Sequence, residues 1–254
     1  MELFDTHCHL NHNVFRADFE KVLERADHSG VNLFLIPGWD LASSKEAVRL
    51  SSLHPQLLAA VGIHPSDWQQ ASPETLKEIE HLAANPRVVA IGEIGLDYHF
   101  DSEHRKEQIE LLTDMFSIAD KVRKPVLIHS RESLSDIMIL VKKWKTRNRP
   151  GIIHAFEGDL EQARELIELG FMLGVGGPLT YKNSHTKKDV FSEIPEEAIV
   201  LETDCPYLPP MPYRGQRNEP AYLPLIAEQL VLLRSKGQPD LIDSIYKNSY
   251  KMFS

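Results

Sequence analysis

The stretch Leu3-Phe4-Asp5-Thr6-His7-Cys8-His9-Leu10 begins the chain with a short apolar strand that ends in two histidines. Side chains alternate across a strand, so His7 and His9 are predicted to point to one side and Cys8 to the other. Two imidazoles that face the same way at a strand end make half of a metal site. We therefore expect the remaining ligands at the ends of other strands.

Seven further apolar runs follow, with mostly helical segments between them. They are Val31–Ile36, Leu57–Ile63, Val88–Ile94, Val126–His129, Gly151–His154, Phe171–Val175 and Ile199–Asp204. Buried parallel strands read as continuous apolar runs rather than alternating ones. Eight β-then-α units predict an α/β fold, a TIM (β/α)8 barrel, in a single domain of residues 1–254. Two extra C-terminal helices are predicted, Leu223–Lys236 and Asp240–Phe253, with Gly237 and Pro239 between them.

Composition limits the partners of the chain. The formal net charge of −9 argues against a broad basic groove for duplex DNA, although bound metal ions would supply positive charge. The two cysteines, Cys8 and Cys205, form no disulfide framework and are expected to be small buried hydrophobes in a reducing cytosol. No apolar run approaches the roughly 20 residues of a membrane span, and no leader pattern is seen. We expect a cytoplasmic protein.

Potential metal ligands recur at the predicted C-terminal ends of the strands. They are His7, His9, Glu93, His129, His154 and Asp204, with His64 as a further histidine before Pro65. In a barrel these ends converge on the face where barrel enzymes keep their chemistry. Mixed imidazole and carboxylate ligands suit zinc, manganese or another borderline ion. Two such ions bridged by a carboxylate can activate one water, which predicts hydrolysis of a phosphodiester or amide-type bond.

Each of these residues also has a structural interpretation. Glu93 alone could be a buried structural carboxylate, His129 could cap the helix that follows, and His154 could be a satisfied core histidine. Asp204 could cap a helix before Pro206. His64 could be a turn residue, a residue that contacts a metal ligand but not the metal, or a contact of a substrate phosphate. The occurrence of all six ligands at strand ends, in barrel order, favours the metal site.

Six motifs together make the chain resemble the TatD family of metal-dependent deoxyribonucleases, within the wider metal-dependent hydrolase superfamily. The motifs span the chain and are Asp5-Thr6-His7-Cys8-His9, Gly62-Ile63-His64-Pro65, Gly92-Glu93-Ile94-Gly95-Leu96-Asp97-Tyr98, Pro125-Val126-Leu127-Ile128-His129-Ser130-Arg131, Glu202-Thr203-Asp204-Cys205-Pro206-Tyr207-Leu208 and Arg217-Asn218-Glu219-Pro220.

This resemblance implies roles for the candidate ligands. His7, His9, Glu93 and Asp204 would hold one divalent ion, and Glu93, His129 and His154 would hold a second, with Glu93 bridging. Asp204 and Glu93 would be the catalytic carboxylates, and Asp204 would orient or deprotonate the attacking water. His64 would lie beside the substrate phosphate. The implied activity is magnesium- or manganese-dependent cleavage of DNA, often from an end.

The chain departs from the family pattern after the sixth-strand histidine. The family usually has Cys-Phe-Ser-Gly or Gly-Phe-Ser-Gly there, whereas this chain has Ala155-Phe156-Glu157-Gly158. The ligand His154 is kept. Glu157 replaces the serine and adds negative charge near the mouth of the site, which opposes tight binding of a polyanion.

Several other residues are candidates for contact with substrate. Arg131 could meet a phosphate, or it could form a salt bridge with Asp97 that holds the loop. The remaining candidates are cations for backbone phosphates and aromatic rings for bases, namely Arg214, Arg217, Tyr207, Tyr213 and Trp68. The alternative for each aromatic ring is ordinary packing under a loop.

The sequence thus predicts a deoxyribonuclease that binds two divalent ions per subunit (Mg, Mn or Zn) and acts on DNA single strands or ends, plausibly as a monomer. A small-molecule amidohydrolase or esterase of the same superfamily is the alternative, favoured by the acidic charge and Glu157. Many binuclear amidohydrolases bridge their metals with a modified lysine, so Glu93 weighs against it. A barrel that has lost catalysis and only binds a partner is a third hypothesis, which the intact ligand set opposes.

Overall fold

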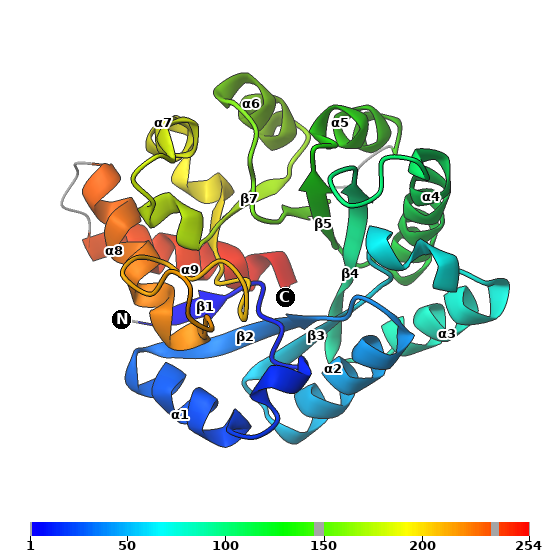
Figure 1. Cartoon of the computed structure of the whole chain (residues 1–254), viewed down its shortest axis with the longest axis horizontal. Helices are drawn as coiled ribbons and strands as arrows, with labels where there is room; N and C mark the ends of the chain where they lie inside the picture. The colour runs from blue at the N-terminus through cyan, green and yellow to red at the C-terminus, as the bar shows by residue number, and fades with distance from the viewer. Residues whose placement is uncertain (1, 145–149, 235–238, 254) are drawn as a thin grey trace.

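Eight parallel strands form one sheet in the order β1 to β8 (Figure 1). The computed structural model describes residues 2–144, 150–234 and 239–253. The strands are β1 (Leu3–Asp5), β2 (Val31–Pro37), β3 (Leu57–Val61), β4 (Val88–Asp97), β5 (Val126–Arg131), β6 (Gly151–Ile153), β7 (Met172–Val175) and β8 (Ile199–Leu201). The amide of Thr6 donates to Leu201 O at 3.0 Å, which joins the segment after β1 to β8. The predicted TIM-barrel fold is confirmed.

In Figure 1 most of the helices surround the strands as an outer ring, while the last one crosses the middle of the view. They are α1 (Phe19–His28), α2 (Leu41–Leu53), α3 (Pro73–Ala83), α4 (Arg105–Val122), α5 (Leu134–Lys143), α6 (Leu160–Glu168), α7 (His185–Glu193), α8 (Leu223–Leu233) and α9 (Pro239–Phe253). The two predicted C-terminal helices are α8 and α9, and Lys236 and Gly237 lie outside the described residues. No helix in the described ranges is long and apolar enough to cross a membrane.

The barrel interior is filled by one buried side chain from each strand. This inner cluster consists of Phe4, Leu35, Ala60, Ala90, Leu127, Ile152, Met172 and Val200, together with Met252 of α9. The rings of Phe4 and Phe253 lie 5.7 Å apart, so α9 packs against the inner cluster. The other face of the strands packs against the helices in a larger apolar cluster. Apolar contacts on both faces explain why the strands read as continuous apolar runs.

Most strand ends differ from those of the predicted runs, and two of these differences bear on the site. The first strand ends at Asp5, and His7 to His9 continue as extended chain that is hydrogen-bonded on both sides, through Cys8 N to Leu35 O and His9 N to Cys205 O. β4 runs three residues beyond the predicted end at Ile94, and its pairing with β5 shifts register between Ile91 and Ile94. Glu93 therefore lies at a register break inside β4 rather than at its end.

Leu127 provides a test of the inner cluster. We expect Leu127→Ala to lower the free energy of unfolding by about 2–5 kcal/mol, because the cavity left between eight strands cannot collapse. Leu232→Ala is the matched control, since Leu232 is 74% exposed on α8 and its truncation should change stability by less than about 0.5 kcal/mol. Urea unfolding followed by circular dichroism measures both. If both variants lost the same free energy of unfolding, Leu127 would not belong to the packed interior of the barrel.

Candidate metal centre

Glu93 lies between two groups of histidines and directs one carboxylate oxygen to each. Its Oε2 atom is 3.4 Å from His7 Nε2 and 3.5 Å from His9 Nε2. Its Oε1 atom is 3.1 Å from His129 Nδ1 and 3.7 Å from His154 Nε2. The carboxylate is almost fully buried, so these imidazoles replace water around it. A carboxylate in this position can bridge two cations.

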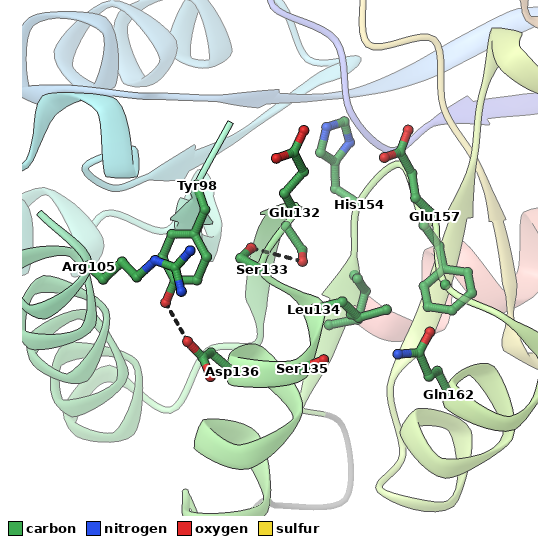
Figure 2. A pocket seen from close by; sticks show the side chains of 14 residues that line it. Tyr98, Arg105, Glu132, Ser133, Leu134, Ser135, Asp136, His154, Glu157 and Gln162 are labelled. Atoms are coloured by element: carbon green, nitrogen blue, oxygen red, sulfur yellow. Dashed lines mark hydrogen bonds between the residues drawn. The ribbon is translucent and has the colours of Figure 1, made fainter. Parts of the chain in front are cut away.

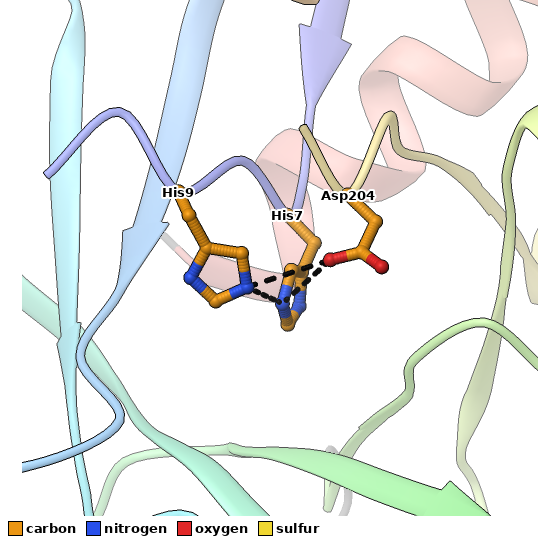
Figure 3. Close-up of side chains that lie close together, drawn as sticks. All are labelled: His7, His9 and Asp204. Carbon is orange, nitrogen blue, oxygen red and sulfur yellow. Dashed lines mark hydrogen bonds and ion pairs between the residues drawn. The ribbon is translucent and has the colours of Figure 1, made fainter. Parts of the chain in front are cut away.

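The first cluster consists of His7, His9, Asp204 and Glu93 Oε2. Figure 3 shows the side chains of His7, His9 and Asp204 converging from the ends of β1 and β8. The two Nε2 atoms lie 3.2 Å apart, and Asp204 Oδ1 is 3.4 Å from His9 Nε2 and 3.8 Å from His7 Nε2. An ion about 2.1 Å from tetrahedral ligands places neighbouring donor atoms about 3.4 Å apart. The donor set and its spacing therefore fit a divalent ion.

The second cluster consists of His129 and His154, whose rings lie 6.1 Å apart on either side of Glu93 Oε1, and His64 Nε2 lies 3.9 Å from the same oxygen. Asp204 reaches both clusters, since its second oxygen, Oδ2, lies 3.9 Å from His154 Nε2. The backbone of Asp204 has a φ of +57°, and Ala155, next to His154, has a φ of +46°. Left-handed backbone at non-glycine residues is uncommon and gathers at functional sites. The structure thus brings together the six side chains that were predicted from the strand ends as candidate ligands.

The charges in the centre are strongly coupled. Burial raises the pKa of Glu93 and Asp204, but the surrounding histidines outweigh it, and the pKa of each carboxyl is below its ordinary value. Burial lowers the pKa of His129, but Asp97 and Glu93 raise it to about 8, and Glu202 and Asp204 likewise raise the pKa of His154 to about 10. The carboxylates are ionised at neutral pH, and a cation that binds these histidines releases their protons.

Two carboxylates stand behind the second cluster. Asp97 Oδ2 lies 3.1 Å from His129 Nε2, and Glu202 Oε1 lies 3.2 Å from His154 Nδ1. Asp97 was considered as a partner for Arg131, but the structure pairs it with His129. Glu202 was not predicted, although it precedes Asp204 by two residues and alternation would place both on one side of the chain.

The centre opens into a cavity of about 600 Å³. Of the predicted substrate contacts, His64, Arg131 and Tyr207 line it. The guanidinium of Arg131 lies 4.8 Å from the ring centre of Phe100, and Arg131 has no ion-pair partner within the described part of the chain. Tyr207 is 52% exposed and Phe100 is 70% exposed, so both rings stand at the mouth of the cavity.

Sequence reasoning missed two aromatic residues, Trp39 and Phe100, in the loops after β2 and β4. Trp39 follows β2, and its ring lies 5.5 Å from the ring of His9 and 5.9 Å from that of His12. Tyr207 approaches the same two histidines, at 6.0 and 6.2 Å. Trp39, His12 and Phe100 all line the cavity. The available signal was position, because Trp39 occupies the loop after a barrel strand, where barrel sites lie.

His64 faces the bridging carboxylate. Its Nε2 atom lies 3.9 Å from Glu93 Oε1, and its Nδ1 atom accepts a hydrogen bond from the Ser66 amide at 3.1 Å. Burial lowers the pKa of His64 to about 3, so the ring is neutral. Because Nδ1 is an acceptor, Nε2 carries the proton and can donate it in a hydrogen bond within the cavity.

Four predicted substrate contacts have other partners. Arg217 donates to both oxygens of Asp18, each at 2.8 Å, because the loop after β8 passes the start of α1. Arg214 lies over the ring of Tyr181, Tyr213 stacks on Tyr222, and Trp68 donates to Asp101 at 3.1 Å. None of the four is among the residues lining the cavity of the metal centre. The two predicted hydrophobic cysteines, Cys8 and Cys205, are buried and free.

A second cavity, of about 430 Å³, adjoins the first between the loops after β5 and β6. The two share Ser130, His154 and Glu157. In Figure 2 the side chains of Glu132, His154 and Glu157 point to the same end of this cavity. Tyr98 donates to Asp136 at 2.7 Å, and the guanidinium of Arg105 covers the ring of Tyr98. Glu157 thus borders both cavities, which agrees with its predicted place at the mouth.

Comparison with known proteins identifies the family. The model of the TatD related DNase family matches residues 4–254. The chain is 38% identical over 251 residues to the uncharacterized metal-dependent hydrolase YabD of Bacillus subtilis, covering 99% of this chain and 98% of that one. It is 31% identical over 239 residues to the 3'-5' ssDNA/RNA exonuclease TatD of Klebsiella pneumoniae, covering 92% and 91%.

A solved structure agrees with this assignment. The crystal structure of the TatD homologue YjjV from Escherichia coli superimposes with a TM-score of 0.94 at 31% identity, covering 99% of this chain and 97% of that one. The resemblance that the motifs indicated is confirmed. The chain belongs to the TatD related DNase family and is a metal-dependent hydrolase.

Proposed function

We propose that this hydrolase cleaves phosphodiester bonds of DNA from a single-stranded end, with two divalent ions at its centre. The observation that carries the proposal is the position of Glu93, whose two oxygens each face a separate cluster of imidazoles. The residues around Glu93 would hold two ions, which would supply stabilising charge for the attacking and leaving oxygens of a displacement at phosphorus.

The residues divide into ligands and groups that act on substrate. His7, His9, Asp204 and Glu93 would hold one ion, and His129, His154 and Glu93 the other. When bound, the ions supply Lewis acidity and an activated water. Asp204 directs Oδ2 toward His154, where it can accept the proton of the attacking water. His64 presents a neutral Nε2–H group to the same space and can donate a hydrogen bond to a phosphate oxygen.

The mouth of the cavity supports a nucleic-acid substrate. Trp39, Phe100 and Tyr207 present aromatic rings on which bases can stack, and stacking tolerates any base sequence. Arg131 offers a guanidinium without an ion-pair partner in the ranges described, suited to a phosphate next to the cleaved one. The Klebsiella relative is named as an exonuclease of single-stranded DNA and RNA.

A small-molecule hydrolase is the second candidate, and the charge of the cavity favours it. Five carboxylates line the cavity, namely Asp67, Glu93, Asp97, Glu157 and Asp204, against the single guanidinium of Arg131. Two divalent ions would balance four of these charges. With Arg131 balancing the fifth, the loaded cavity would carry no net positive charge, which suits an uncharged ester or amide better than a polyanion.

Cleavage of an end-labelled single-stranded oligonucleotide tests the proposal. Chelator-stripped protein receives magnesium, manganese or zinc singly, and Asp204→Asn protein runs alongside as the control for contaminating nucleases. We expect a ladder that shortens from one end, that depends on metal and that is absent in the variant. Stoichiometric metal binding without cleavage of single- or double-stranded DNA would refute the nuclease and leave the small-molecule hydrolase.

Tyr207 provides a test of base stacking. We expect Tyr207→Leu to raise KM for a single-stranded oligonucleotide about 5- to 150-fold, because the stacking of one base contributes about 1–3 kcal/mol. The kcat value should change little, since the ring contacts no reacting atom. Tyr250→Leu is the matched control, since Tyr250 is 57% exposed on α9. An unchanged KM in Tyr207→Leu protein would remove this ring from the substrate site.

A further inference from the structure

The two clusters of the metal centre differ in the groups that lie near the second ring nitrogen of each histidine, the one turned away from Glu93. His129 and His154 each turn their second ring nitrogen to a carboxylate, that of Asp97 or Glu202. The buried Nδ1 atoms of His7, His9 and His154 all lack a partner in hydrogen-bond geometry among the residues that the structure describes, but of the three only His154 Nδ1 is paired with a carboxylate, Glu202, at an ion-pair distance of 3.2 Å. Carboxylates therefore support one pair of histidines and not the other.

The fold makes room for Glu202 beside His154. The residue follows β8, is fully buried, and accepts a hydrogen bond from the Ala155 amide on Oε1 at 2.6 Å. On β7, a Cβ atom at Gly174 would lie 2.4 Å from Glu202 Oε2, so a larger residue there would displace this carboxylate. A buried carboxylate costs free energy unless a cation or hydrogen bonds stabilise it. Its position against His154 indicates that it acts on this ligand.

Asp97 is held as firmly beside His129. Its Oδ1 atom accepts hydrogen bonds from the amides of His99 at 3.0 Å and Phe100 at 3.1 Å. These bonds leave Oδ2 directed at His129 Nε2. The ring nitrogen on the other side, Nδ1, is the one that faces Glu93. Asp97 therefore fixes which nitrogen of His129 is turned to the metal centre.

We propose that the two metal sites are unequal: the site of Glu93, His129 and His154 binds its ion more tightly and fills first, and Asp97 and Glu202 are the positioning residues that make it so. The inference rests on the two-ion centre of the proposed function but not on its substrate. A carboxylate behind a ligating histidine orients the ring, fixes its tautomer and strengthens it as a donor. Both carboxylates also add negative charge close to the cation.

Titration of chelator-stripped protein with Mn²⁺ in a calorimeter tests the inference without any substrate. We expect two binding events of different affinity in the wild-type protein. Asp97→Asn and Glu202→Gln should each weaken the tighter event about 10- to 100-fold and leave the weaker one nearly unchanged. Asp204→Asn should act mainly on the weaker event. Glu157→Gln is the charge-matched control, because Glu157 borders the same cavity and is not one of the six candidate ligands.

Both variants preserve the local hydrogen bonds. The amide oxygen of asparagine can still accept from His99 and Phe100, and that of glutamine can still accept from Ala155, and circular dichroism checks that each protein is folded. Equal affinities in the wild-type protein, or variants that leave the tighter event unchanged or weaken both events equally, would overturn the inference. If the two sites bind Mn²⁺ with unequal affinity but the protein cleaves no DNA, only the proposed nuclease function is refuted. If the two affinities are equal and the protein cleaves DNA, only the present inference is refuted.

Discussion

Asp204→Asn is expected to lower kcat by about 10²- to 10⁴-fold, because the variant loses the group that accepts the proton of the attacking water. Asparagine is the appropriate replacement, since Asp204 has a φ of +57° and asparagine tolerates this conformation better than most residues. The fold should be kept, and the ion at the His129 and His154 site should be largely retained. Steady-state kinetics and the metal content of dialysed protein measure the two effects.

A control variant away from the metal centre distinguishes the loss of one negative charge from the loss of the proton acceptor. Asp243 is exposed on α9, so Asp243→Asn makes the same chemical change without approaching the centre. Its activity and metal content should equal those of the wild-type protein. If Asp204→Asn protein retained a substantial part of the wild-type kcat, Asp204 would not be the group that accepts the proton.

Glu93→Gln is expected to abolish both metal binding and turnover. An amide cannot offer one anionic oxygen to each cluster, and its NH₂ group would face histidine nitrogens or a cation on one side. A ligand that binds only the folded protein raises its melting temperature, so Mn²⁺ should stabilise the wild-type protein against heat. The same addition should leave the melting temperature of Glu93→Gln protein unchanged, which tests the bridge without an activity assay.

Glu157→Gln again serves as the matched variant, because it removes one negative charge from the rim of the same cavity. Its melting temperature should rise with Mn²⁺ as in the wild-type protein. A Glu93→Gln protein that still gained the full stabilisation from Mn²⁺ would show that the ion binds without the bridge.

The candidate ligands could be predicted because each one lies at or next to the end of an apolar run in the sequence. His129 and His154 directly follow apolar runs, and alternation places His7 and His9 on one side of the chain. The barrel then brings strand ends together whatever the loops between them contain. The motif around Glu93 was recognised, but Glu93 was predicted to lie at the end of a strand. It lies instead at a register break inside β4, which depends on how β4 pairs with β5.

The contacts of the remaining site residues depend on chain segments that are distant in sequence. Arg217 was expected at the substrate, but Asp18, which is 199 residues away in the chain, lies within hydrogen-bond distance of it. Asp97 pairs with His129 rather than Arg131, and Trp39 reaches the centre from β2. Local spacing indicates neither partner of Arg217 and Asp97, and for Trp39 it indicates only the face of the barrel on which the ring lies.

The sequence by itself determined the barrel and the six side chains at its centre, because apolar runs and the residues that end them are local patterns. Only the tertiary structure decided that Glu93 faces both clusters, that Asp97 and Glu202 stand behind one of them, and that Trp39 and Phe100 line the mouth. The physical reason is that hydrogen bonds and ring contacts require distances of a few ångströms between segments, and only the packing of strands, loops and helices sets those distances.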